Sequence, residues 1–293
     1  MLMLEQLDNL NSTEILTLKP FPEDYPVFLY SKSPIPKIPN NDLIPYHPVG
    51  LSQQGMIYFL HTQNKHNICR KFASAIMQEA IEKDGQILFP YKFKYKVKCI
   101  GKVIPPFYSA MAQGEALSFF SLCYNETKDA FYKRTAKKIL PSLLRIKDQD
   151  TPYLSIIEDN YLFFEEAPWN GKTPKILNGF MFDIIGLINY LTLVDNNDKL
   201  AKKLLETSIK TLIDWFTKWR IPNSISRYWL ISDNRSLGYH YIHVKQLYLL
   251  WLSTKIDKLL YFKNLLETDA KNALSVKGII EFAKSRFKHH LCI

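Results

Sequence analysis

His240 and His243 are two imidazoles that a helix would place on one face, because they lie three residues apart in a segment with helical character. Such a pair can ligate zinc, but a zinc site needs further ligands, and no Glu-x-x-His pattern or third ligand accompanies them. The spacing therefore favours hydrogen bonding, in a site or in the core. We expect no metal and no cofactor.

Two amide side chains interrupt segments of small or apolar residues. Gln113 lies in the stretch 105–116, which begins with a double proline, and Asn178 lies at the start of the apolar stretch 177–194. The prolines fix an extended entry to the helix that follows. Each amide could orient a sugar hydroxyl or cap backbone groups, and the sequence leaves both roles open.

Lysines alternate with apolar residues between Tyr91 and Cys99. A period of two places one set on each face of a strand, and the lysine face comprises Lys92, Lys94, Lys96 and Lys98. These lysines either protect a strand edge from pairing or form a basic rail for a polyanion. The two roles are compatible.

The charge balance favours an anionic partner. Lysine and arginine number 38 against 28 acidic residues, which gives a net charge of +10. No recognised nucleic-acid motif is present, so an acidic glycan is the expected partner and nucleic acid is not. A homodimer is compatible with the sequence.

The segments that would direct the chain to a membrane or to secretion are not apparent. No apolar run reaches roughly 18 residues, so we expect no integral membrane segment, and the first residues lack a basic signal-peptide start. The spacing of the four cysteines is not that of a metal site or a disulfide framework, and we interpret them as reduced thiols. They are Cys69, Cys99, Cys123 and Cys292. The expected localisation is cytoplasmic.

Helical periodicity predicts a mainly α protein. Residues 1–45 are rich in proline and should form an extended arm that wraps the surface of a domain at 46–293. A β-hairpin is expected at 151–165. Helices are expected over about 49–61, 65–83, 108–123, 130–144, 177–194, up to 219, 237–253 and from 258 onward. About eight helices in consecutive pairs suit an α/α toroid of helical hairpins.

Three segments resemble signatures of the C-terminal catalytic domain of the D-glucuronyl C5-epimerase family. Residues 105–116, PPFYSAMAQGEA, are similar to PWYSAMAQGQA; residues 177–187, LNGFMFDIIGL, to LNGFxYSLIGL; and residues 239–247, YHYIHVKQL, to YHTTHINQL. The three lie in family order, and the resemblance extends from about Tyr46 to Phe262. It implies an α/α toroid and C5 epimerisation of a uronic-acid glycan.

Epimerisation at C5 of a uronate requires a base on one face of the sugar, an acid on the other and a clamp on the carboxylate. The resemblance implies a catalytic set of Tyr108, Glu166, Tyr228 and Tyr239, converging on one cleft. Nearby histidines and positive charge predict a phenolate or strongly polarised hydroxyl at Tyr239, with Glu166 on the opposite face.

The expected substrate contacts fall into two groups. Arg227, His240 and Lys245 are candidates to pair the substrate carboxylate. The other expected contacts are His243, Gln113, Asn178, Lys94 and Lys96.

Two departures from the family pattern leave the activity open. Ala167 replaces a tyrosine of the family's catalytic set, and Ile231 replaces an arginine. The chain is therefore expected to be a uronosyl C5-epimerase, a uronate lyase that expels the C4 substituent from the same carbanion, or an inactive protein that binds an acidic glycan.

Overall fold

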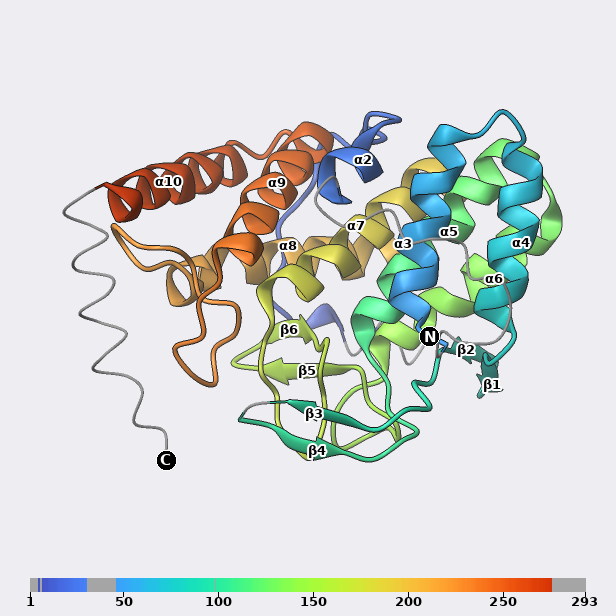
Figure 1. Ribbon diagram of the computed structural model, residues 1–293, viewed down its shortest axis with the longest axis horizontal. Coiled ribbons are helices and arrows are strands. Elements are labelled where there is room, and N and C mark those ends of the chain that lie inside the picture. The colour runs from blue at the N-terminus through green and yellow to red at the C-terminus, as the bar shows by residue number, and fades with distance from the viewer. Residues whose placement is uncertain (1–4, 6, 31–45, 98, 276–293) are drawn as a thin grey trace.

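The computed structural model describes residues 5, 7–30, 46–97 and 99–275, and over these the fold is mainly α-helical with small β hairpins (Figure 1). The predicted fold class is thereby confirmed, and the closed toroid stays a prediction. The prolines from Pro34 to Pro45, Lys98, Cys292 and the basic tail at 284–290 lie outside the described residues. None of the described helices is long and apolar enough to cross a membrane.

Two buried helices form the centre of the fold. They are α5 (Ala110–Thr127) and α7 (Leu177–Leu193), and almost every residue of α7 is buried. They approach each other at glycines: a Cβ on Gly114 would lie 2.4 Å from Asp183 Oδ1, and one on Gly186 would lie 2.5 Å from the Gly114 carbonyl. The absence of a Cβ at these two glycines therefore allows the backbones of α5 and α7 to approach closely.

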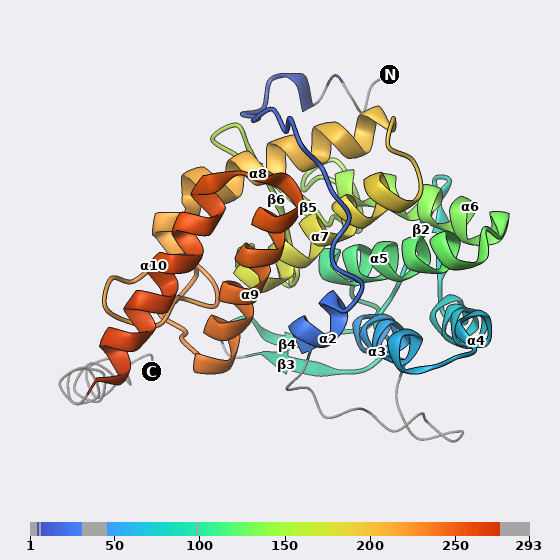
Figure 2. The ribbon, with the colours of Figure 1, turned by 90° about the horizontal axis from the view of Figure 1, so that it is seen from above.

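Most of the other helices pack against this pair, and the last one, Asp257–Leu274, packs against the two helices before it (Figure 2). They are α3 (Pro48–His61), α4 (Lys65–Met77), α6 (Ala130–Ile139), α8 (Lys199–Trp219), α9 (Leu237–Thr254) and α10 (Asp257–Leu274). Asn64, Asp129 and Asp198 cap α4, α6 and α8, each accepting a hydrogen bond from a backbone N–H of the first turn. Pro141 lies in the 3-10 turn Leu140–Leu144, which follows α6.

Three antiparallel hairpins complete the described fold. They are β1 (Ile81–Lys83) with β2 (Gln86–Leu88), β3 (Tyr95–Val97) with β4 (Gly101–Val103), and β5 (Ser155–Glu158) with β6 (Tyr161–Phe164). The hairpin predicted at 151–165 is confirmed. The helix predicted over 65–83 is too long, because Asp84 and Gly85 adopt positive φ and turn β1 into β2. The strand predicted at 91–99 is confined to β3, apart from a bridge between Tyr91 and Phe107.

The N-terminal arm differs from the extended segment that was predicted. It contains a short helix, α2 (Tyr25–Tyr30), in which Pro26 occupies the second position, where its missing N–H costs nothing. Leu7 and Tyr25 are buried. Backbone hydrogen bonds hold the arm against the rest of the chain; for example, the Lys19 N–H donates to the carbonyl of Ser253.

Candidate active site

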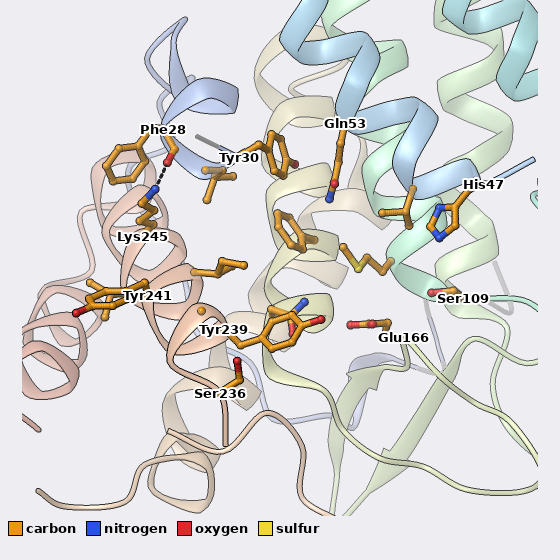
Figure 3. A pocket seen from close by; sticks show the side chains of 18 of the residues that line it. Phe28, Tyr30, His47, Gln53, Ser109, Glu166, Ser236, Tyr239, Tyr241 and Lys245 are labelled. Atoms are coloured by element: carbon orange, nitrogen blue, oxygen red, sulfur yellow. Dashed lines mark hydrogen bonds between the residues drawn. The ribbon is translucent and has the colours of Figure 1, made fainter. Parts of the chain in front are cut away.

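A cavity of about 970 Å³ opens between α2, α3, α9 and the segment that precedes β3 (Figure 3). Much of its wall is aromatic. Phe107 and Trp169 meet edge to face with ring centroids 4.8 Å apart, and Tyr91 stacks on Phe107 at 4.9 Å. A concave, largely aromatic pocket with a few polar groups is typical of a small-ligand or sugar site.

Glu166 supplies a carboxyl group to this pocket. Its Oε1 accepts a hydrogen bond from the hydroxyl of Tyr228 at 3.0 Å, whereas its buried Oε2 has no partner among the described residues. Burial raises the pKa of Glu166 to about 7, and the hydrogen bond from Tyr228 acts in the opposite direction. A Cβ on Gly179 would lie 2.3 Å from Oε2, so only glycine lets the carboxyl rest on the start of α7.

Tyr228 and Tyr239 pack together beside Glu166, with ring centroids 4.3 Å apart. The hydroxyl of Tyr239 points toward the Glu166 carboxyl in Figure 3. Burial raises the pKa of Tyr239, and the Glu166 carboxyl raises it further; the pKa of Tyr228 is raised for the same reasons. Of the two forms predicted for Tyr239, the phenolate is contradicted, because burial and the Glu166 carboxyl both raise the pKa of this phenol; the polarised hydroxyl stays a prediction.

Tyr108 does not join this group, so the predicted convergence of four residues is wrong for one of them. The chain is extended just before α5, with Ser109 at φ −147° and ψ 132°, and successive side chains alternate. Phe107 and Ser109 line the pocket and Tyr108 does not. Burial raises the pKa of Tyr108, and the charges of Lys92 and Arg145 act against that rise.

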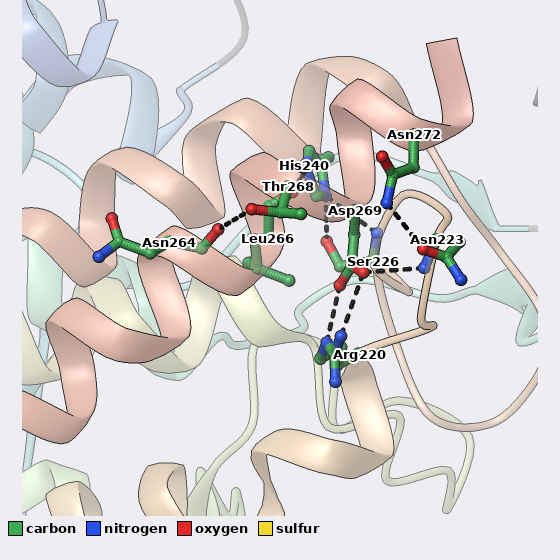
Figure 4. Close-up of polar contacts among 9 residues, drawn as sticks. All are labelled: Arg220, Asn223, Ser226, His240, Asn264, Leu266, Thr268, Asp269 and Asn272. Atoms are coloured by element: carbon green, nitrogen blue, oxygen red, sulfur yellow. Dashed lines mark hydrogen bonds and ion pairs between the residues drawn. The ribbon is translucent and has the colours of Figure 1, made fainter. Parts of the chain in front are cut away.

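The two histidines lie behind the pocket wall, which contradicts their assignment to substrate. His240 Nδ1 accepts from the backbone N–H of Ser226 at 2.9 Å, and its Nε2 lies 3.1 Å from the carbonyl of Leu266 (Figure 4). His243 is buried, which lowers its pKa to about 3. Both are neutral core groups that tie α9 to the loop before it. Within the described ranges, no group of three or more His, Cys, Asp or Glu could hold a metal ion.

The amides and the remaining cations divide between pocket and framework. Asn178 lines the pocket, and its Oδ1 has no partner in the described chain. Lys245 also lines it, with Nζ donating to the carbonyl of Phe28. Gln113 instead fixes the β2 segment, since it bonds the backbone of Ile87 and Phe89. Arg227 lies outside the pocket lining, and its guanidinium donates to a backbone carbonyl of α8.

The lysine face turns away from the cavity. Tyr91, Phe93 and Tyr95 line the pocket, so the alternating side chains of Lys94 and Lys96 lie on the opposite face and are exposed. Their placement as contacts for a substrate in this pocket is therefore wrong. Their role as protection of an exposed strand edge stays a prediction.

The sequence reasoning missed a second carboxyl–phenol pair. Tyr30, from the arm, donates to Glu115 at 2.9 Å, and Gln53 Nε2 donates to the same carboxyl at 2.7 Å. Tyr30 and Gln53 line the pocket. Burial raises the pKa of Glu115 to about 8. The one available signal was a glutamate among the small residues of α5; nothing in the sequence linked it to Tyr30.

The fold and the site define a mainly α-helical protein with an aromatic pocket that holds a buried carboxyl beside two protonated phenols. A model of the family described as D-glucuronyl C5-epimerase C-terminus matches residues 83–268. The chain belongs to this family.

A curated relative, the D-glucuronyl C5-epimerase of Caenorhabditis elegans, is 32% identical over 110 residues. The aligned part covers 36% of this chain and 17% of that relative. The chain therefore corresponds to a small part of the relative's length.

Proposed function

We propose that the chain is a uronosyl C5-epimerase that acts on a uronic-acid glycan. The observation that carries the proposal is the state of Glu166, a buried carboxyl in an aromatic pocket whose pKa lies at about 7. A general base is most effective when its pKa lies near the working pH. Membership of the epimerase family supports the same reaction.

Glu166 and Tyr239 divide the work of base and acid. Glu166 removes the C5 proton and the C5–H electron pair moves into the sugar carboxylate; inversion then requires a sugar position in which the acid reaches the carbanion from the other face. Tyr239 suits the acid role because its raised pKa keeps the phenol protonated. Groups whose surroundings push their pKa values apart are the expected acid–base partners. Tyr228 holds the Glu166 carboxyl through its hydrogen bond.

The test is isotope exchange at C5. The full chain is incubated in heavy water with a heparosan-like glycan and other uronate glycans, and deuterium at C5 is measured. We expect exchange in the wild type and a loss of at least about a hundredfold in Glu166→Gln and in Tyr239→Phe. Glu126→Gln, which changes an exposed carboxyl on α5, is the matched control.

Two other outcomes would replace the proposal. Ultraviolet absorbance from an unsaturated uronate would show elimination by a lyase. Binding of glycan with no exchange on any uronate would show a binding protein without the activity, consistent with Ala167 in place of a family tyrosine.

A further inference from the structure

Three helices begin at the pocket without a side-chain cap. The N-cap residues of α5, α7 and α9 are Ser109, Ile176 and Ser236, and none of them makes a capping hydrogen bond. Asn64, Asp129 and Asp198 cap α4, α6 and α8, and His47 caps α3, whereas α10 also lacks a side-chain cap. A helix start presents backbone N–H groups and the positive end of the helix dipole. Uncapped starts facing a cavity therefore attract an anion.

Two buried polar atoms at these starts lack partners. Ser109 Oγ and Asn178 Oδ1 belong to residues that are each 3% exposed; both residues line the pocket, and neither atom has a hydrogen-bond partner among the described residues. Buried polar groups are nearly always paired. Because the Asn178 amide can turn to present either its oxygen or its nitrogen, it can also donate. These side chains are available to a ligand.

Both helix starts lie at the Glu166 end of the pocket. The backbone N–H of Ala110, the first residue of α5, donates to the carbonyl of Glu165 at 2.9 Å. The start of α7 touches Glu166 itself, through Gly179, and Leu177 N–H donates to the carbonyl of Tyr228 at 3.0 Å. The first N–H of each helix is therefore already used, and the groups left without a partner beside Glu166 are the side-chain atoms Ser109 Oγ and Asn178 Oδ1.

Ordinary cationic clamps do not occupy this end. Of the described residues that line the pocket, those able to carry positive charge are His47, Lys245 and Lys263. Lys245 is held at the carbonyl of Phe28, on the arm, and Lys263 pairs with Glu267 on α10 at 2.8 Å. The Nδ1 of His47 accepts from the Gly50 N–H, and burial lowers the pKa of this imidazole. A uronate carboxylate beside Glu166 must then be bound by other donors.

We propose that Ser109 and Asn178, with the uncapped starts of α5 and α7, bind the carboxylate of the uronate sugar. The inference rests on the proposed function for the position of the sugar. When Glu166 takes the C5 proton, the C5–H electron pair passes into the carboxylate and leaves two negative charges on its oxygens. Helix starts placed there stabilise the charge as it develops. This site takes the place of Arg227, His240 and Lys245, which the sequence suggested as partners of the carboxylate.

The experiment compares an anionic and a neutral sugar. Binding of methyl β-D-glucuronide and of methyl β-D-glucoside to the full chain is measured by NMR titration. We expect the wild type to prefer the glucuronide. Ser109→Asp places a fixed anion at the start of α5 and should weaken glucuronide binding by about tenfold to a hundredfold, the range of a charge-assisted hydrogen bond. Glucoside binding should stay unchanged.

Two further variants make the result interpretable. Ser109→Ala removes only the hydroxyl and should cost glucuronide binding about threefold to tenfold, which covers a failure of the Asp variant to fold. Ser74→Asp adds the same charge at an exposed position on α4 and should change nothing.

The inference is overturned if the wild type shows no preference for the glucuronide, or if both Ser109 variants bind it as the wild type does. That failure is separate from a failure of the proposed function. If Glu166→Gln loses C5 exchange but both Ser109 variants bind the glucuronide fully, the proposed function is supported and the carboxylate site is not. If the preference for the glucuronide depends on Ser109 but the wild type shows no C5 exchange, the carboxylate site is supported and the proposed function is not.

Discussion

Replacing Tyr228 by phenylalanine should move the pH dependence of C5 exchange. The Tyr228 hydroxyl donates to Glu166 at 3.0 Å and thereby favours the ionised carboxylate. A hydrogen bond to a charged group contributes roughly 1.5–3 kcal/mol, which corresponds to about 1–2 pH units at 1.36 kcal/mol per unit. Removing it should raise the pKa of Glu166 from about 7 to roughly 8–9.

The assay is kcat/KM for C5 exchange across pH, because this parameter reports ionisations of the free enzyme. The limb that rises with pH, as Glu166 loses its proton, should shift to higher pH by about 1–2 units in Tyr228→Phe. The rate should then recover at high pH. Tyr248→Phe removes a phenol that lines the same pocket and should leave the limb in place.

An unshifted limb in Tyr228→Phe would refute the assignment of Glu166 as the base. A limb that shifts while the plateau also falls by about a hundredfold would show that Tyr228 itself delivers a proton.

Three further changes test other parts of the reasoning. The pKa of Glu115 is raised from 4.5 to about 8. Its contribution to the free energy of unfolding is therefore full below about pH 4.5 and is lost as pH rises through about 8. In urea denaturation, the wild type should lose a few kcal/mol of unfolding free energy between pH 5 and 8 that Glu115→Gln does not lose. Gly179→Ala should displace the Glu166 carboxyl and lower C5 exchange by about tenfold or more, and an unchanged rate would mean that the carboxyl position is unimportant. The double variant Lys94→Gln, Lys96→Gln should change KM by less than about threefold at fixed salt. A larger increase in KM would support the role of these lysines in binding a polyanion.

Helix positions were predictable because the periodicity and the caps agree. The segment ending at Trp219 carries Leu205, Ile209, Leu212 and Phe216 on one buried face, and Asp198 caps it. The arm was mispredicted because proline was taken to exclude a helix. Pro26 lies in the first turn of α2, where proline is well tolerated.

The candidate site was predictable only where a motif also fixed the direction of a side chain. Glu166, Tyr228, Tyr239 and Asn178 do come together, whereas Tyr108 does not line the pocket, although its neighbours Phe107 and Ser109 in the extended segment before α5 do. A sequence motif alone does not show which of two alternating sets of side chains faces the pocket. The pairing of Tyr30 with Glu115 joins residues 85 positions apart, and no local periodicity encodes a contact of that range.

The arm has a consequence for how sequences of this family diverge. The matched region spans residues 83–268, yet Phe28, Tyr30 and Gln53 form part of the pocket wall from outside it. Mutations in the first sixty residues can therefore reshape the binding surface while every residue of the matched region stays the same. Two relatives with identical matched regions could therefore differ in the sugar that they accept. Joining the matched region to another N-terminal arm would exchange part of the pocket.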